Sequence, residues 1–108
     1  MSIYTDAQEI IHSALEACLP DQAVRRALEG KELGSGRVFL VALGKAAWQM
    51  ARCAAELLGP RLEQGVVVTK HGHSQGDIPR CQVFEGGHPV PDEGSFRGTR
   101  AAMELVQD

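Results

Sequence analysis

The chain has 108 residues, which fits one domain of ordinary size and is too short for two. Hydrophobic residues make up 44% and charged residues 23%, a composition typical of folded globular domains. The net charge of −3 gives no basic footprint for nucleic acid or an anionic membrane, and no apolar run is long enough to span a bilayer. Residues 1–5 lack the basic and apolar regions of a secretory signal peptide.

The three cysteines, Cys18, Cys53 and Cys81, are far apart and form no C-x-x-C pair, which argues against a zinc ribbon or a thioredoxin-type site. Cys18 and Cys53 lie among apolar residues in helical patterns, so we expect both to be buried, reduced thiols. Reduced thiols suit a protein of the cytoplasm.

Two helices are predicted before the first strand. Thr5 and Gln8 have the spacing of a capping box that starts the first helix. Its apolar face recurs at helical spacing: Ile10, Ile11, Ala14, Leu15 and Cys18. Pro20 ends this helix and begins the second, which stops near Gly30. Residues 31–36 are polar and rich in glycine, which indicates a connector.

Strands and helices alternate in the rest of the chain. Val38–Leu43 is apolar on both faces, which predicts a central strand of a parallel sheet. A helix is expected to start near Lys45, with an apolar face that runs from Ala47 to Leu58. Residues 65–69 read as a second strand and residues 81–85 as a less apolar edge strand. A last helix is expected from Ser95. Its predicted apolar face is Phe96, Ala102, Met103, Leu105 and Val106.

This order of elements predicts an α/β fold, a Rossmann-like, doubly wound parallel sheet with flanking helices. A sheet of only three strands has two poorly protected edges. We therefore expect the sheet to be incomplete, so that the chain is a fragment or needs a partner.

Gly44 and Lys45 stand between the most apolar strand and the helix that follows it. Open α/β sheets bind ligands beyond the carboxyl ends of their strands, where a helix N-terminus offers free N–H groups and a partial positive charge. Lys45 adds a full charge, which suits a phosphate or a carboxylate. The spacing matches neither a Walker loop nor the Rossmann glycine fingerprint, and an ordinary turn with a solvated lysine remains the alternative.

Lys70 follows the second predicted strand as Lys45 follows the first, so adjacent parallel strands would place both lysines at one edge of the sheet. His71 and His73 come directly after it. Their spacing could suit a metal, but no carboxylate at ligand spacing joins them. We predict no metal site and interpret the two histidines as part of an exposed polar loop.

The segment of residues 86–95 has an unusual composition. Gly86 and Gly87 allow close approach of the backbone to another group. His88 is a candidate hydrogen-bond donor to a substrate or an acid–base group. Asp92 or Ser95 is expected to cap the last helix.

Together these segments resemble the glycerate 2-kinase family, in the bacterial and animal form with a carboxy-terminal MOFRL domain. The resemblance is carried by residues 41–47 (VALGKAA), residues 65–73 (GVVVTKHGH) and residues 86–95 (GGHPVPDEGS), in the same order and at similar spacing. It is strongest from Val38 onward.

The resemblance implies an ATP-dependent kinase that phosphorylates the 2-hydroxyl of D-glycerate to give 2-phosphoglycerate, with Mg²⁺ travelling with the nucleotide. Residues 1–108 would be the N-terminal part of its Rossmann-like domain, with the second domain absent and the chain inactive alone. The family's catalytic cleft lysine falls on Lys45. Substrate or phosphate binding is expected at Gly44, Lys70, Gly86, Gly87 and His88.

Two alternatives remain open. Members of this family are often called hydroxypyruvate reductases, which implies an NAD(P)H-dependent enzyme, although the G-x-G-x-x-G fingerprint is missing. The other alternative is a non-catalytic α/β module that binds a small anion or associates with itself. The expected partners are D-glycerate and a nucleotide, with no nucleic acid and no membrane, and exposed sheet edges would support a homo-oligomer.

Overall fold

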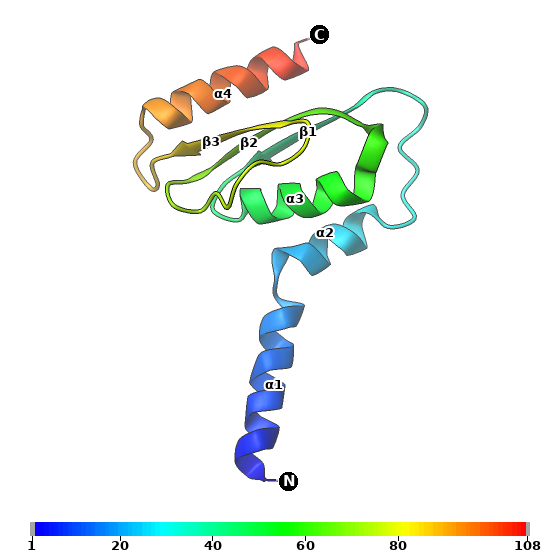
Figure 1. Ribbon diagram of the computed structural model, residues 1–108, viewed down its shortest axis with the longest axis vertical. Helices are drawn as coiled ribbons and strands as arrows, with labels where there is room; N and C mark the ends of the chain where they lie inside the picture. The colour runs from blue at the N-terminus through cyan, green and yellow to red at the C-terminus, as the bar shows by residue number, and fades with distance from the viewer. Residues whose placement is uncertain (1, 108) are drawn as a thin grey trace.

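A computed structural model describes residues 2–107 and shows a three-stranded parallel sheet with helices on both faces (Figure 1). The elements, in chain order, are α1 (Ile3–Ala17), α2 (Pro20–Leu28), β1 (Val38–Leu43), α3 (Ala47–Leu58), the 3₁₀ turn η1 (Gly59–Arg61), β2 (Leu62–Lys70), β3 (Cys81–Gly86) and α4 (Glu93–Val106). The predicted α/β fold with a Rossmann-like parallel sheet is confirmed.

The strand order is β1-β2-β3, so β2 is the central strand and β1 and β3 are the edges. The edge position of β3 agrees with the sequence, but the prediction that Val38–Leu43 is central is wrong for this sheet. Val41 and Leu43 remain 39% and 65% exposed, because α4 packs mainly on β2 and β3. β1 is therefore an apolar edge strand, and its side chains on the α4 side of the sheet are largely exposed.

The main core lies between α3 and the sheet. Ala47 and Ala51 are almost fully buried, so the small side chains let α3 approach β2 closely at Val67. Trp48 fills the remaining space beside Ile78, and its indole N–H donates to the Gly76 carbonyl at 2.9 Å. This bond satisfies the one polar group of a large buried side chain.

α4 covers the opposite face of the sheet from α3 (Figure 1). Gly98 is buried there, and a Cβ atom at this position would stand 2.4 Å from the Val68 side chain. The contact side of α4 is thus formed by small residues and Leu105. The predicted apolar face is wrong for three members, which are more than half exposed: Phe96, Met103 and Val106.

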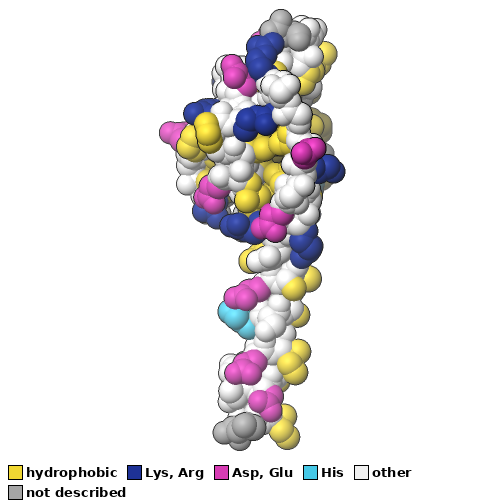
Figure 2. Space-filling model, turned by 90° about the vertical axis from the view of Figure 1, so that its right-hand side faces the viewer, with side chains coloured by type: hydrophobic (Ala, Val, Ile, Leu, Met, Phe, Trp, Pro, Cys, Tyr) yellow, Lys and Arg dark blue, Asp and Glu magenta, His cyan; other side chains and the backbone are white. Residues whose placement is uncertain are grey.

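Helix α1 projects away from the sheet and buries none of its residues (Figures 1 and 2). It begins earlier than predicted, because the Ser2 hydroxyl accepts the Thr5 N–H at 3.1 Å and acts as the cap. Cys18 after it is exposed, contrary to expectation, whereas Cys53 is buried as predicted. Among the described residues, no helix is long and apolar enough to cross a membrane.

Candidate functional site

The carboxyl ends of the three strands carry the residues singled out in the sequence. Leu43 pairs with Val68 and Lys70 pairs with Gly86, so the strands end at nearly the same level. We call the segments that follow them the lysine turn (residues 44–46), the histidine loop (residues 71–76) and the glycine loop (residues 87–91). The expectation that Lys45 and Lys70 lie at one edge of the sheet is therefore confirmed for their backbones.

The lysine turn continues the sheet for one residue and then enters α3. The Gly44 N–H donates to the Val68 carbonyl at 3.0 Å, and Gly44 has a φ of +118°, a conformation that disfavours any other residue. Ala46, the cap residue of α3, gives no side-chain cap. The Ala47 N–H already donates to the Gly44 carbonyl at 3.1 Å, but no side chain caps the start of α3 beside the exposed Lys45. An uncapped helix start next to a lysine is a favourable place for an anion.

The backbone carbonyl of Lys45 is held from the neighbouring strand. It accepts hydrogen bonds from the Thr69 hydroxyl at 3.3 Å and from His73 Nδ1 at 3.1 Å. Since a carbonyl oxygen only accepts, His73 must carry its proton on Nδ1. Thr69 and His73 were not identified as functional from sequence, because their partner lies more than 20 residues earlier.

The histidine loop is exposed, as predicted, but hydrogen bonds attach it to β3 and to the start of α4. The Glu85 carboxylate accepts the N–H of Gly72 at 2.8 Å and that of Ser74 at 3.1 Å. His71 Nε2 lies 2.7 Å from Asp92 Oδ2, at the start of α4. The two histidines of the H-G-H sequence therefore point to different partners, which is a structural role that the sequence interpretation missed.

The glycine loop turns back sharply after β3. A Cβ atom at Gly87 would stand 2.1 Å from the Val90 carbonyl, and one at Gly86 would stand 2.4 Å from the Ser95 hydroxyl. These two glycines are needed for close backbone packing within the protein itself. His88 is exposed at the beginning of the loop, and its peptide bond to the following proline is cis.

Asp92 follows the glycine loop and caps α4. Its carboxylate accepts the Ser95 N–H at 3.3 Å, and its own N–H donates to the Ser95 hydroxyl, so both predicted caps act together as a capping box. The hydrogen bond from His71, followed by that from the Gly87 N–H, lowers the pKa of Asp92 to about 2. The Asp92 carboxylate is therefore ionised at neutral pH, and it connects the histidine loop to the start of α4.

The edge as a whole offers positive charge and hydrogen-bond donors. Lys45, Lys70 and the open start of α3 suit a phosphate or carboxylate, and His88 adds a ring that can donate or accept a proton. Within residues 2–107, no three His, Cys, Asp or Glu side chains come together in a way that could hold a metal ion.

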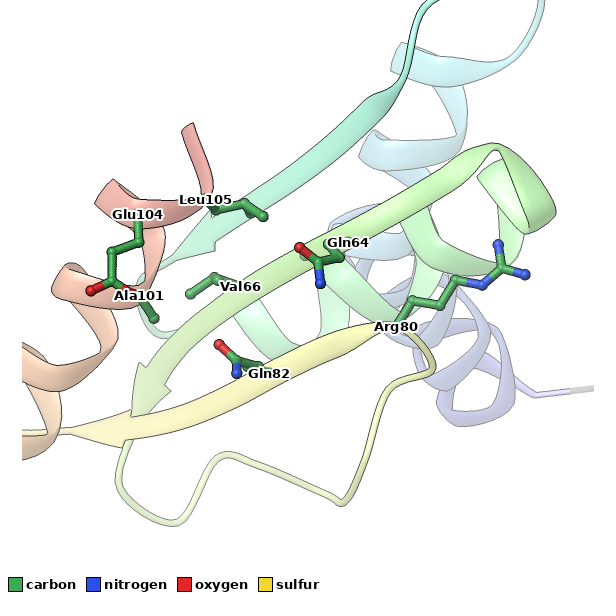
Figure 3. A pocket seen from close by; sticks show the side chains of 8 residues that line it. Gln64, Val66, Arg80, Gln82, Ala101, Glu104 and Leu105 are labelled. Carbon is green, nitrogen blue, oxygen red and sulfur yellow. The ribbon is translucent and has the colours of Figure 1, made fainter. Parts of the chain in front are cut away.

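A hollow of about 240 Å³ lies at the other end of the sheet (Figure 3). It is lined by Gln64 and Gln82, near the starts of β2 and β3, and by Glu104 of α4. Ligand pockets usually measure roughly 300–1,000 Å³, so this hollow is small for a substrate. None of the sequence-predicted site residues lines it.

Fold and site together define a parallel α/β protein with a basic edge at the carboxyl ends of its strands. Residues 6–108 match the sequence family described as a domain of unknown function, DUF4147. The chain belongs to this family.

Several relatives are named glycerate kinases. The chain is 51% identical over 100 residues to D-glycerate 2-kinase of Thermotoga maritima, covering 93% of this chain and 24% of that protein. It is 36% identical over 116 residues to glycerate 2-kinase of Pyrococcus horikoshii, covering 98% of this chain and 26% of that protein. Weaker matches include proteins named putative hydroxypyruvate reductase.

A solved structure agrees with these relatives. The crystal structure of glycerate kinase from Thermotoga maritima superposes with a TM-score of 0.83 at 51% identity, covering 93% of this chain and 24% of that one. The resemblance to glycerate 2-kinases is thereby confirmed. The chain spans about a quarter of the length of these relatives.

Proposed function

We propose that this chain forms the part of an ATP-dependent D-glycerate 2-kinase that carries Lys45, at the carboxyl ends of the sheet strands. The supporting observation is that a chain 51% identical to a protein of that name presents an exposed lysine beside the open N-terminus of α3. Residues 1–108 form the N-terminal part of the Rossmann-like domain in this proposal. The opposite wall of the cleft belongs to a second domain, so the chain alone is expected to be inactive.

The reaction moves one phosphoryl group. The 2-hydroxyl oxygen of D-glycerate bonds to the γ-phosphorus of ATP, the bond from that phosphorus to ADP breaks, and the hydroxyl proton is released. In such reactions the protein mainly positions groups and neutralises charge. Lys45 acts as the catalytic residue, by neutralising either the transferring phosphoryl group or the substrate carboxylate.

In this proposal two of the remaining predicted residues bind substrate or nucleotide, and the three glycines shape the site. Lys70 and His88 offer donors to the anionic groups of substrate and nucleotide. The turn made by Gly44 keeps the N-terminus of α3 accessible, and Gly86 and Gly87 bring the glycine loop close to the edge of the sheet. Mg²⁺ is expected to arrive with the nucleotide phosphates, and no residue of this chain is assigned to it.

The test uses a chimera in which this chain replaces the matching 24% of the Thermotoga maritima relative. We expect the chimera to convert ATP and D-glycerate to ADP and 2-phosphoglycerate, with the phosphate located at carbon 2 by ³¹P NMR. Lys45→Met should lower kcat/KM by roughly a hundredfold, the size expected when one charged contact is removed from a closed site. Near-normal turnover of a folded Lys45→Met chimera would contradict the role of Lys45.

Two controls accompany this assay. Lys31→Met removes another exposed lysine, in the connector before β1, and should leave turnover unchanged. The same chimera should not oxidise NADH or NADPH in the presence of hydroxypyruvate, and clear oxidation would favour the reductase instead.

We also place the protein in the cytoplasm. All three cysteines are free, and Cys18 is exposed on the surface. A reducing compartment would keep such a thiol from forming disulfides. Fractionation of cells that express the tagged protein tests this assignment.

A further inference from the structure

The Asp92 carboxylate joins three segments of the chain at one point. His71 donates to Oδ2 at 2.7 Å, and Ser95 donates its N–H to Oδ1 at 3.3 Å. The backbone of Gly87 packs against the same carboxylate, since a Cβ atom there would stand 3.1 Å from Oδ2. Because a carboxylate of low pKa only accepts, His71 must carry its proton on Nε2. Capping of α4 needs only the bond from Ser95, so the bond from His71 is a further constraint on Asp92.

Close packing against Asp92 holds the glycine loop. A Cβ at Gly87 would stand 2.1 Å from the Val90 carbonyl and 3.1 Å from Asp92 Oδ2, so the loop is closed tightly around the carboxylate. His88 follows Gly87 directly, and its backbone position is set by this closure. The hydrogen bond from His71 to Asp92 attaches the glycine loop to the end of β2.

The histidine loop makes hydrogen bonds towards both the lysine turn and the residue that follows the glycine loop. His73 donates to the Lys45 carbonyl at 3.1 Å, and His71, two residues earlier, bonds Asp92, which holds Gly87. The histidine loop therefore bridges the two segments that carry the candidate catalytic and binding side chains. These hydrogen bonds constrain the distance between the lysine turn and the glycine loop.

We propose that His71 and Asp92 are positioning residues, whose hydrogen bond holds His88 at a fixed place relative to Lys45 so that one anionic group of D-glycerate is bound between them. This inference rests on the proposed function and adds to it two residues that do not touch the substrate. Loss of the pair loosens the glycine loop, which weakens binding of glycerate more than it slows phosphoryl transfer.

The kinetic test uses the chimera described above. In His71→Ala, kcat/KM for D-glycerate falls roughly tenfold, mainly through a higher KM, the size expected for losing one hydrogen bond to a charged group. His71→Gln, which keeps an N–H donor near the place of Nε2, recovers the value to within about threefold of the parent chimera. An unchanged KM in His71→Ala overturns the proposal.

Two matched variants separate positioning from other effects. His12→Ala removes an exposed pair with Glu16, 3.5 Å apart on α1, and leaves the KM unchanged. Ser95→Ala removes the hydroxyl that accepts the Asp92 N–H, which is half of the capping box, while the Ser95 N–H and His71 still bond Asp92. If Ser95→Ala raises the KM as much as His71→Ala does, the effect comes from capping and the proposal fails.

A second readout does not require turnover. Hydrogen exchange followed by mass spectrometry should show faster exchange across residues 86–91 in His71→Ala than in the parent chimera or in His12→Ala. Equal exchange in all three overturns the positioning role. An inactive but folded parent chimera would overturn the proposed kinase function, whereas the exchange experiment would still test the link between His71 and Asp92.

Discussion

The carboxyl edge of the sheet and helix α1 are stabilised in opposite ways. At the edge, hydrogen bonds join residues far apart in sequence, such as His71 to Asp92 and His73 to Lys45. The side-chain pairs on α1 join residues three or four positions apart, and the helix buries none of its side chains. The edge is shaped by tertiary structure, whereas α1 depends on local interactions, which leave a 15-residue helix only marginally stable in water.

The largest expected change in stability is at a buried leucine of the sheet, and an exposed leucine on α1 provides the comparison. Leu62 is 1% exposed at the start of β2, so Leu62→Ala should lower the free energy of unfolding by about 3 kcal/mol, through lost burial and a cavity. Leu15 is 63% exposed, so Leu15→Ala should change it by less than about 0.5 kcal/mol. Urea unfolding of this chain measures both, and equal losses would show that α1 packs against the sheet.

A smaller effect is expected from the charge of Asp92. The folded-state pKa of about 2 lies below the ordinary value of 3.8, so the folded state favours the ionised carboxylate. This contribution is fully present above about pH 4 and is lost as the pH falls towards 2. The difference in melting temperature between the parent chain and Asp92→Asn should therefore shrink over that range. A constant difference would contradict an ionic role for Asp92.

The smallest effect concerns the open side of β1. We expect this chain to associate weakly with itself through its exposed strand edges, as unpaired apolar strands do. Leu43→Lys should reduce the association measured by sedimentation velocity, because a lysine blunts the edge strand. Val106→Lys changes an equally exposed apolar residue of α4 and serves as the control (66% against 65% exposed). A monomeric parent chain at all concentrations would refute this expectation.

Local patterns in the sequence predicted much of the fold. The limits of Val38–Leu43 agree with β1, and the helix expected from near Lys45 is α3, which begins at Ala47. Apolar periodicity and the glycines that flank it act over a few residues, so both elements could be predicted. The position of Lys45 after β1 followed from the same pattern. The place of β1 in the sheet did not, because strand order depends on pairing between distant segments.

The bonded network of the candidate site was beyond prediction for a similar reason. His71 and Asp92 are 21 residues apart, and their contact depends on the paths of two loops. The sequence assigned Asp92 correctly to capping, which is a local role, and gave no signal for its second partner. The exposure of Phe96 was missed because the sheet-facing side of α4 is defined by the small Gly98 and not by large apolar residues.

The position of α4 on the face opposite α3 also limits how the sheet can grow. Connections between parallel strands are almost always right-handed, so a strand added after α4 would lie beside β1, on its open edge. The strand order would then run outward in both directions from β1. Lys45 would stand at the crevice where the order reverses, the place at which open α/β sheets bind their ligands.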